Sequence, residues 1–213
     1  VTAPDNITIE ACGTADITTA LNGSALAYDE TGATITIAQY LAETGAAATD
    51  NCTITSITYS DATAGTCPTV VTRTFIVMDQ CLNITTVAQT ITIDDNTNPI
   101  VTAPGDQSIE ACDITTGLAA AGFANYSETA VDITGQETAF GLTVVEACNY
   151  TTSYIDTQAG SCPVVITRTF TVTDGCLNVG TDSQSISIDD TTDPIVTAPD
   201  NITIEACGTA DIT

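Results

Sequence analysis

The chain has 213 residues, with 27 acidic side chains against two arginines and a formal net charge of −25 at pH 7. This charge excludes nucleic acid as a natural partner and opposes docking on anionic lipid, because both surfaces attract positive charge. The sequence contains no histidine and no lysine, which excludes histidine-based acid–base catalysis and lysine Schiff bases.

One motif recurs three times and sets the organisation of the chain. Residues 196–213 repeat residues 1–18 letter for letter, and a looser copy begins at Val101. Residues 67–104 align without a gap on residues 162–199, with 25 of 38 positions identical. Self-similarity at a fixed spacing is typical of repeat architectures. We therefore expect a first domain at residues 1–97, a second at residues 98–193, and the first strand of a further repeat at residues 194–213.

Short alternating strands dominate the predicted elements. In the first repeat they are Asn6–Cys12, Cys52–Tyr59, Val70–Met78 and Gln89–Asp94, and the second repeat has their counterparts. The segment Ile35–Glu43 is typical of either a strand or a short helix. Short strands separated by turns, without a long helix, predict an all-β fold of tandem Ig-like antiparallel β-sandwich domains stapled by disulfides.

The cysteines recur in register and include no closely spaced metal-type pair, which indicates disulfides formed in an oxidising compartment. The last strand of each domain must end at the linker, so strand direction places Cys81 at the N-terminal pole and Cys67 at the C-terminal pole. Cys52 then lies beside Cys81, and Cys12 approaches Cys67. Of three connectivities, this topology favours Cys12–Cys67 and Cys52–Cys81, with Cys112–Cys162 and Cys148–Cys176 in the second domain. Cys207 is left for a partner in another domain or subunit.

The two arginines occupy equivalent positions on strands whose alternation points them toward the core. A guanidinium in such a position must either reach the rim of the sheet or meet a carboxylate partner. The acids that recur in both repeats are the candidates for this structural ion pair: Glu10 and Glu110, or Asp61 and Asp156.

Acidic and amide side chains gather at the predicted junction between the domains. Oxygen ligands from a linker and its two flanking domains suit Ca²⁺, which takes six to eight of them. The candidate ligands are Asp94, Asp95, Asn98, Asp106, Asp174 and Asn178. The alternative is that Asp and Asn here simply favour turns.

Seven asparagines occupy Asn-X-Ser/Thr sequons and are candidate glycosylation sites: Asn6, Asn22, Asn51, Asn83, Asn125, Asn149 and Asn201. Threonine is so frequent that several sequons would arise by chance, and O-linked sugar on threonine is an equal alternative.

The recurring pattern CPxxxTRTFxVxDxCxN…QxIxIxD, preceded by VTAPxDxxIEAC, resembles the hyalin-repeat (HYR-like) modules of large bacterial surface proteins, including adhesins and gliding-motility proteins. The chain departs from that pattern at Leu82 and Leu177, where those modules often have glycine before the asparagine. The resemblance implies Ig-like sandwiches displayed outside the cell in tandem arrays, and it implies no catalytic residues.

These features predict a structural tandem-repeat module of an extracellular fibre or bacterial surface stalk, with copies of itself as partner and without membrane insertion. The next repeat would follow either on the same chain or by strand donation between subunits. An adhesin segment that binds glycans or proteins through its loops is the alternative. An enzyme is not expected, because the recurring acids lie at strand ends and linkers and predict no catalytic cleft.

Overall fold

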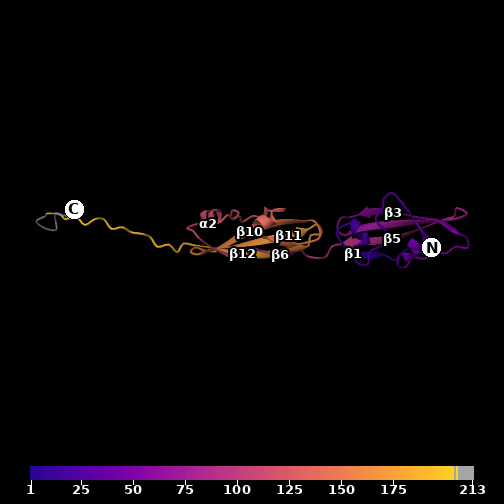
Figure 1. The fold of residues 1–213 in the computed structure, drawn as a ribbon, viewed down its shortest axis with the longest axis horizontal. Helices are drawn as coiled ribbons and strands as arrows, with labels where there is room; N and C mark the ends of the chain where they lie inside the picture. The colour runs from indigo at the N-terminus through magenta and orange to yellow at the C-terminus, as the bar shows by residue number, and fades with distance from the viewer. Residues whose placement is uncertain (204, 206–213) are drawn as a thin grey trace.

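The computed structural model describes residues 1–203 and 205. Figure 1 shows two β-rich bodies arranged end to end along the long axis of the molecule, followed by an extended C-terminal segment. We call residues 1–94 the first unit, residues 95–99 the linker and residues 100–189 the second unit. Residues 190–203 have no regular secondary structure. A strand is expected at residues 194–213, and of this range residue 204 and residues 206–213 lie outside the described residues.

The first unit is built on a five-stranded sheet with the order β1-β5-β4-β3-β2. Its elements are β1 (Ile7–Glu10), the 3-10 helix η1 (Thr14–Thr18), β2 (Ala33–Ile35), α1 (Ile37–Ala42), β3 (Ile54–Ala64), β4 (Thr69–Asp79) and β5 (Ile84–Asp94). The three long strands, β3, β4 and β5, are antiparallel neighbours that stay in register along almost their whole length.

The second unit repeats this sheet with the order β7-β12-β11-β10-β8. Its elements are β6 (Ile100–Thr102), β7 (Gln107–Glu110), α2 (Ile114–Ala120), β8 (Val131–Asp132), the 3-10 helix η2 (Glu137–Phe140), β9 (Thr143–Val145), β10 (Tyr150–Gly160), β11 (Val164–Asp174) and β12 (Val179–Asp189). β6 and β9 form a separate two-stranded antiparallel sheet. Its residues Val101 and Val144 pack on the core beneath β10 and β11.

The expected all-β fold is confirmed, but the two large sheets are mixed and not purely antiparallel as predicted. β1 runs parallel to β5, and β7 runs parallel to β12. The parallel pairing follows from chain direction: β1 and β5 both run toward the C-terminal end of the first unit, and β7 and β12 both run toward the C-terminal end of the second. The ambiguous segment Ile35–Glu43 is both things in turn, because β2 ends at Ile35 and a capping box between Thr36 and Gln39 starts α1.

Alternation along the central strand builds the core of each unit. In the first unit Val71, Phe75 and Val77 of β4 are buried, and Arg73 is buried among them with no exposed surface. Its guanidinium forms a two-point ion pair with Asp61, at 2.8 and 2.9 Å. The prediction of a carboxylate partner is thus confirmed for Asp61, while Glu10 instead accepts hydrogen bonds from the linker.

The second unit has the same arrangement. Arg168 pairs with Asp156 through two contacts of 2.8 Å, and its guanidinium lies 4.2 Å from the ring centre of Tyr154. Glu110, the other candidate, accepts hydrogen bonds from Thr191 and Thr192 after β12. Both arginines are therefore structural groups that fasten loops to the sheet.

Candidate functional site at the junction of the two units

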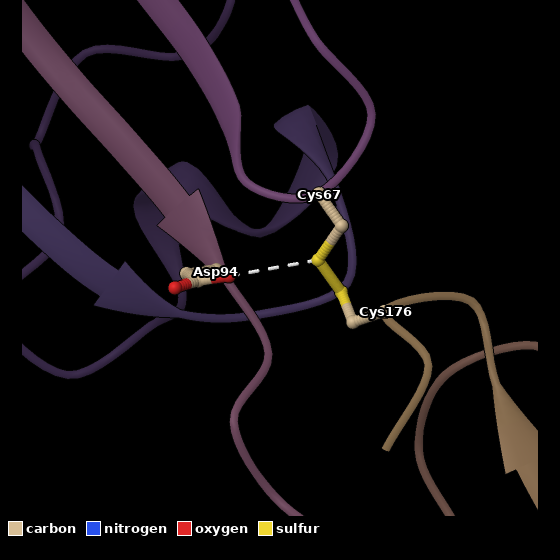
Figure 2. Close-up of side chains that lie close together, drawn as sticks. All are labelled: Cys67, Asp94 and Cys176. Carbon is tan, nitrogen blue, oxygen red and sulfur yellow. Dashed lines mark hydrogen bonds between the residues drawn. A yellow bond between two sulfur atoms is a disulfide. The ribbon is translucent and has the colours of Figure 1, made fainter.

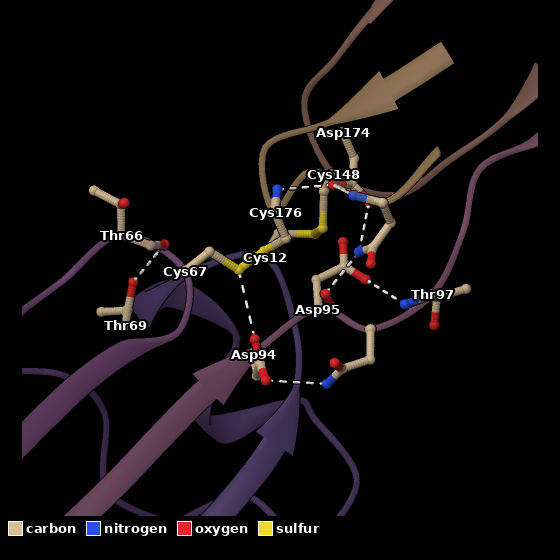
Figure 3. The surroundings of a disulfide bond; sticks show 12 residues. Cys12, Thr66, Cys67, Thr69, Asp94, Asp95, Thr97, Cys148, Asp174 and Cys176 are labelled. Carbon is tan, nitrogen blue, oxygen red and sulfur yellow. Dashed lines mark hydrogen bonds between the residues drawn. A yellow bond between two sulfur atoms is a disulfide. The ribbon is translucent and has the colours of Figure 1, made fainter. Parts of the chain in front are cut away.

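Two disulfides cross the junction between the units. Cys12, just after β1, bonds to Cys148, just before β10, with Cα atoms 5.2 Å apart. Cys67, between β3 and β4, bonds to Cys176, between β11 and β12, with Cα atoms 5.3 Å apart. Figure 3 shows the two bonds close together at the meeting ends of the units. The C-terminal end of the first unit is therefore stapled twice to the N-terminal end of the second.

The predicted pairing of cysteines within each domain is wrong. Neither Cys12–Cys67 nor Cys148–Cys176 forms, because each of these cysteines bonds across the junction. The other two predicted bonds, Cys52–Cys81 and Cys112–Cys162, are also not formed, since all four of these cysteines are free among the described residues. The predicted poles hold: Cys12 and Cys67 share one pole, and Cys148 and Cys176 share the facing one. The prediction paired cysteines within one pole, whereas in the structure the two poles face each other and their cysteines bond across the junction. Cys207 lies outside the described residues.

The cysteine that follows the central strand of each unit, Cys81 or Cys176, lies in a tight turn. In the second unit Asp174 Oδ1 accepts hydrogen bonds from the backbone N–H groups of Cys176 and Asn178, at 2.7 and 2.9 Å. Leu177 has φ of 70°, in the left-handed region that favours glycine. This backbone requirement gives a physical reason why the resembling modules often have glycine at this position.

One hydrogen bond joins this turn directly to the linker. The side-chain amide of Asn178 donates to the backbone carbonyl of Asp95 at 2.7 Å, and Figure 3 shows the Asp95 side chain beside Cys148 and Asp174. Asp95 itself accepts from the N–H of Thr97 at 3.0 Å. The linker is thus fixed on both sides, because Glu10 of the first unit accepts from the N–H of Asn96 at 2.8 Å.

Asp95 is the electrostatically unusual residue of the junction. Only 6% of it is exposed, and its Oδ2 atom has no hydrogen-bond partner. Burial raises the pKa of this carboxyl, and the nearby carboxylates of Glu10, Asp174 and Glu146 raise it further, although the N–H of Thr97 opposes the shift. The pKa of Glu10 is lowered, chiefly by its hydrogen bond from the backbone of Asn96.

The structure brings together part of the predicted calcium set. Asp95, Asp174 and Asn178 meet at the junction, and Asn98 lines a recess of about 280 Å³ together with Asp95 and Glu146. Carboxylate oxygens of Asp95 and Glu146 lie within 4.8 Å of each other. Both oxygens of Asp174 are already engaged by its own turn, which fits the alternative reading of this acid as a turn residue.

Two of the predicted ligands lie elsewhere. Asp94 faces the other disulfide, with its Oδ1 atom 3.5 Å from Cys67 Sγ (Figure 2). Asp106 lies away from the junction, where its carboxylate accepts from the N–H of Ser185 at 2.8 Å, just past the middle of β12. It is close to the linker in sequence only, because β6 first carries the chain along the unit before β7 begins.

Two acids of the junction, Glu10 and Glu146, are not among the predicted ligands. The sequence presents Glu10 as a candidate partner for arginine, and its recurrence as Glu110 is the signal that marks it. Glu146 stands two residues before Cys148, whose N–H it accepts at 2.7 Å. Its counterpart, Asp50, makes the same bond to Cys52. An acid two residues before a repeated cysteine was therefore a signal in the sequence.

All seven sequon asparagines are exposed. Asn83 is the one with a structural task at a unit end, because its amide donates to Asp79 Oδ2 at 2.7 Å. Modification of these asparagines stays a prediction.

Within residues 1–203 and 205, no helix has the length and apolar character needed to span a membrane. The two disulfides indicate an oxidising compartment. Comparison with family models and with curated proteins found no match to this chain. The resemblance to hyalin repeats therefore rests on the sequence motifs alone.

Proposed function

We propose that the chain is a structural module of an extracellular fibre or surface stalk, in which repeated β-sandwich units follow one another end to end. The observation that carries this proposal is the double disulfide at the junction. A single covalent linker lets two units swing and twist about each other, whereas two further bonds oppose both motions. The site therefore serves to hold the axis of one unit on the axis of the next.

The energetics support a load-carrying role. The disulfides join residues 136 and 109 positions apart in the chain. In the chain-entropy model, closing loops of this length stabilises the folded state by about 4–5 kcal/mol for each bond considered alone. Both bonds lie at the junction and neither lies inside a unit, so in the folded state they also restrict how the two units can move relative to each other.

Repetition supports extension beyond two units. The sequence of residues 196–213 is that of residues 1–18, which in the first unit supply β1 and Cys12. A chain segment with this sequence suits the start of another unit. A bacterial cell surface or extracellular fibre would provide both the oxidising conditions and the need for length.

The aromatic side chains favour this reading over the adhesin alternative. Glycan-binding sites commonly offer exposed aromatic faces to sugar rings. All six tyrosines and four phenylalanines of this chain lie in the described part, and each is buried or half-buried. Several of them contact one another in the two cores, as Tyr40 and Phe75 do edge to face with ring centres 5.0 Å apart.

Electron microscopy of the purified full chain, combined with sedimentation over a range of concentrations, tests the proposal. We expect straight two-unit rods at low concentration and linear assemblies of rods at high concentration. Rods that bend freely at the junction, or monomers at every concentration under both oxidising and reducing conditions, would contradict it. A variant with all four junction cysteines changed to serine is the control, and its images should show a wider spread of angles between the units.

Native material would separate the two modes of extension. Denaturation under reducing conditions should leave very long chains if the repeats are covalently continuous. It should release pieces of 21.8 kDa, the mass of this chain, if separate subunits are joined by strand donation or by disulfides.

A further inference from the structure

Among the described residues, four cysteines are free, and they lie in two pairs at the ends of the two units that face away from the junction. Cys52 precedes β3 and Cys81 follows β4, at the N-terminal end of the first unit. Cys112 follows β7 and Cys162 precedes β11, at the C-terminal end of the second unit. Three of these four cysteines are exposed and Cys52 is half-buried.

Each free pair is the repeat counterpart of a pair that is bonded at the junction. Cys52 and Cys81 hold the places in the first unit that Cys148 and Cys176 hold in the second. Likewise, Cys112 and Cys162 hold the places of Cys12 and Cys67. The internal junction is therefore a template that shows how such ends fit together.

The free N-terminal end already has the hydrogen bonds of its bonded counterpart. Asp79 Oδ1 accepts from the N–H of Cys81 at 2.7 Å, the distance between Asp174 and Cys176. Asp50 accepts from the N–H of Cys52 at 2.7 Å, as Glu146 does from Cys148. The left-handed turn is reproduced as well, with φ of 69° at Leu82 and 70° at Leu177.

The free C-terminal end is preformed in the same way. Glu110 accepts from the N–H of Thr191 at 2.8 Å, matching Glu10 and Asn96 at the junction. Asp190 accepts from the N–H of Thr192 at 3.0 Å, matching Asp95 and Thr97.

The side-chain amide of Asn83, at the N-terminal end of the first unit, makes one hydrogen bond fewer than its counterpart at the junction. The amide of Asn178 serves two acceptors, Asp174 and the carbonyl of Asp95, whereas the amide of Asn83 serves Asp79 alone. The carbonyl of Asp190, the counterpart of Asp95, is the acceptor that would complete the set.

We propose that copies of this chain join head to tail through two disulfides, Cys112 to Cys52 of the next copy and Cys162 to Cys81 of the next copy. The proposal rests on the fibre function above and deepens it by naming the partner and the bonds. The partner surface is the N-terminal end of the first unit of another copy. The contact repeats the internal junction, including the hydrogen bond from Asn83 to the carbonyl of Asp190.

Each bond forms by thiol–disulfide exchange with a small-molecule or protein disulfide as oxidant. One cysteine loses its proton and attacks a sulfur of the oxidant, which releases one thiol and leaves a mixed disulfide. The facing cysteine, also deprotonated, attacks that mixed disulfide and releases the second thiol. Two cysteine thiols and one oxidant disulfide thus give one protein disulfide and two thiols, so a junction consumes two oxidant molecules.

The contact between copies differs from the internal junction at one position. A side chain at Gly180 would collide with the backbone carbonyl of Pro99 in the linker. The counterpart of Gly180 in the first unit is Thr85. Pro194, the counterpart of Pro99, therefore cannot pack against Thr85 in the same way. The proposed contact keeps the two disulfides, their turns and the hydrogen bond from Asn83 to the carbonyl of Asp190, and it lacks the packing of Pro99 on Gly180.

Two complementary variants of the full chain test the proposal. One carries Cys52→Ser and Cys81→Ser, and the other carries Cys112→Ser and Cys162→Ser. All proteins also carry Cys207→Ser, so that only cysteines of the described residues react. Each protein is reduced, reoxidised with glutathione disulfide and analysed on non-reducing gels and by peptide mapping. Recovery of the Cys12–Cys148 and Cys67–Cys176 peptides is the internal control for correct refolding.

The parent protein should give a ladder in steps of 21.8 kDa. Each variant alone should stay monomeric, and an equal mixture of the two should stop at dimers containing the peptides Cys112–Cys52 and Cys162–Cys81. Dimers of either variant alone would show like ends joining and would overturn the proposal. So would monomers with Cys52 bonded to Cys81.

Electron microscopy of the same samples separates failure of this inference from failure of the fibre function. Filaments without a ladder would refute the disulfides and leave the fibre in place. Single rods in every sample would refute both.

Discussion

Asn178 lies across the junction from Asp95 and donates to its backbone carbonyl at 2.7 Å, while the same amide also donates to Asp174 at 2.9 Å. The side chain thus ties the turn that carries Cys176 to the linker that leaves the first unit. No charge is involved, so this bond holds the units together at any pH at which they are folded.

Replacing Asn178 by alanine should therefore loosen the junction. We expect a loss of about 0.5–1.5 kcal/mol in the free energy of unfolding beyond the loss of the turn contact, which is the usual net contribution of one hydrogen bond. Asn83→Ala is the matched control, because Asn83 makes the turn contact without a linker contact. The difference between the two variants in urea denaturation measures the cross-junction bond. Equal losses would show that the bond contributes nothing.

The strand pattern predicts at which end of a unit each cysteine lies, but it does not predict which cysteines form disulfides with each other. Alternation and strand direction place Cys12 and Cys67 at one end of a unit, which holds in the structure. Whether two cysteines at one end bond to each other or to the facing end depends on how closely the units approach. That distance is set by the short linker and its hydrogen bonds to Glu10 and Asn178, none of which is visible as a periodicity.

The candidate metal ligands show the same limit in another form. Asp106 is a neighbour of the linker in sequence, yet β6 separates it from the junction in space. Glu146 is 51 residues beyond Asp95, yet their carboxylates lie together. By contrast, Asp61 and Asp156 were predictable partners of the arginines, because their recurrence and the burial of a guanidinium on a core-facing position both point to an ion pair.

Asp95→Asn should stabilise the folded chain at neutral pH. The folded state raises the pKa of Asp95, first through burial and then through the neighbouring carboxylates. A raised folded pKa means that the penalty for the charged form is absent at low pH and grows as the pH rises from the unfolded pKa through the folded one. The gain in melting temperature should accordingly be largest at neutral pH and vanish toward acid. A variant that is less stable than the parent at pH 7 would contradict this expectation.

Calcium is proposed as the second way to relieve the charge of Asp95. Asp95, Glu146 and Asn98 line one recess. The Oδ2 atom of Asp95 accepts no hydrogen bond from an N–H or O–H donor of the described residues, and it is a hard oxygen ligand of the kind that calcium prefers. At a calcium concentration ten times the dissociation constant, binding to the folded state alone adds about 1.4 kcal/mol. Thermal unfolding with calcium and with chelator measures this gain.

Glu146→Gln should abolish the calcium effect. Asp50→Asn is the matched control, because Asp50 is the counterpart of Glu146 but lies at the opposite end of the first unit from Asp95. Identical melting temperatures with calcium and with chelator in the parent protein would leave Asp95 and Glu146 as acids without a metal.

The buried ion pairs should be costly to break from one side. Arg73→Ala leaves the carboxylate of Asp61 buried without its partner, which typically destabilises by about 3–5 kcal/mol. Arg73 also donates to Ser24 at 2.7 Å and to the carbonyl of Leu26 at 3.0 Å. Urea denaturation of the single variant and of the double variant Arg73→Met/Asp61→Leu tests the mechanism. The double variant should recover much of the loss, and a double variant as unstable as the single one would show that the loop contacts dominate instead.

The rate of oxidation at Cys112 should depend on Asp190. The thiol of Cys112 lies 3.6 Å from Asp190 Oδ2, and the negative charge of Asp190 raises the pKa of this thiol, with their hydrogen bond adding to the shift. Since the thiolate is the reactive form, Cys112 should react slowly near neutral pH. Asp190→Asn removes the charge and should speed alkylation of Cys112 and formation of any disulfide that uses it.

Mass spectrometry of peptides after timed iodoacetamide labelling follows Cys112 directly, with Cys81 as the internal reference in the same protein. Raising the pH from 7 to 9 should also increase the rate of Cys112 alkylation by a smaller factor in the Asp190→Asn variant than in the parent protein. If the two proteins label Cys112 at the same rate throughout this range, the carboxylate exerts no control over the thiol, and assembly at this end is governed by access alone.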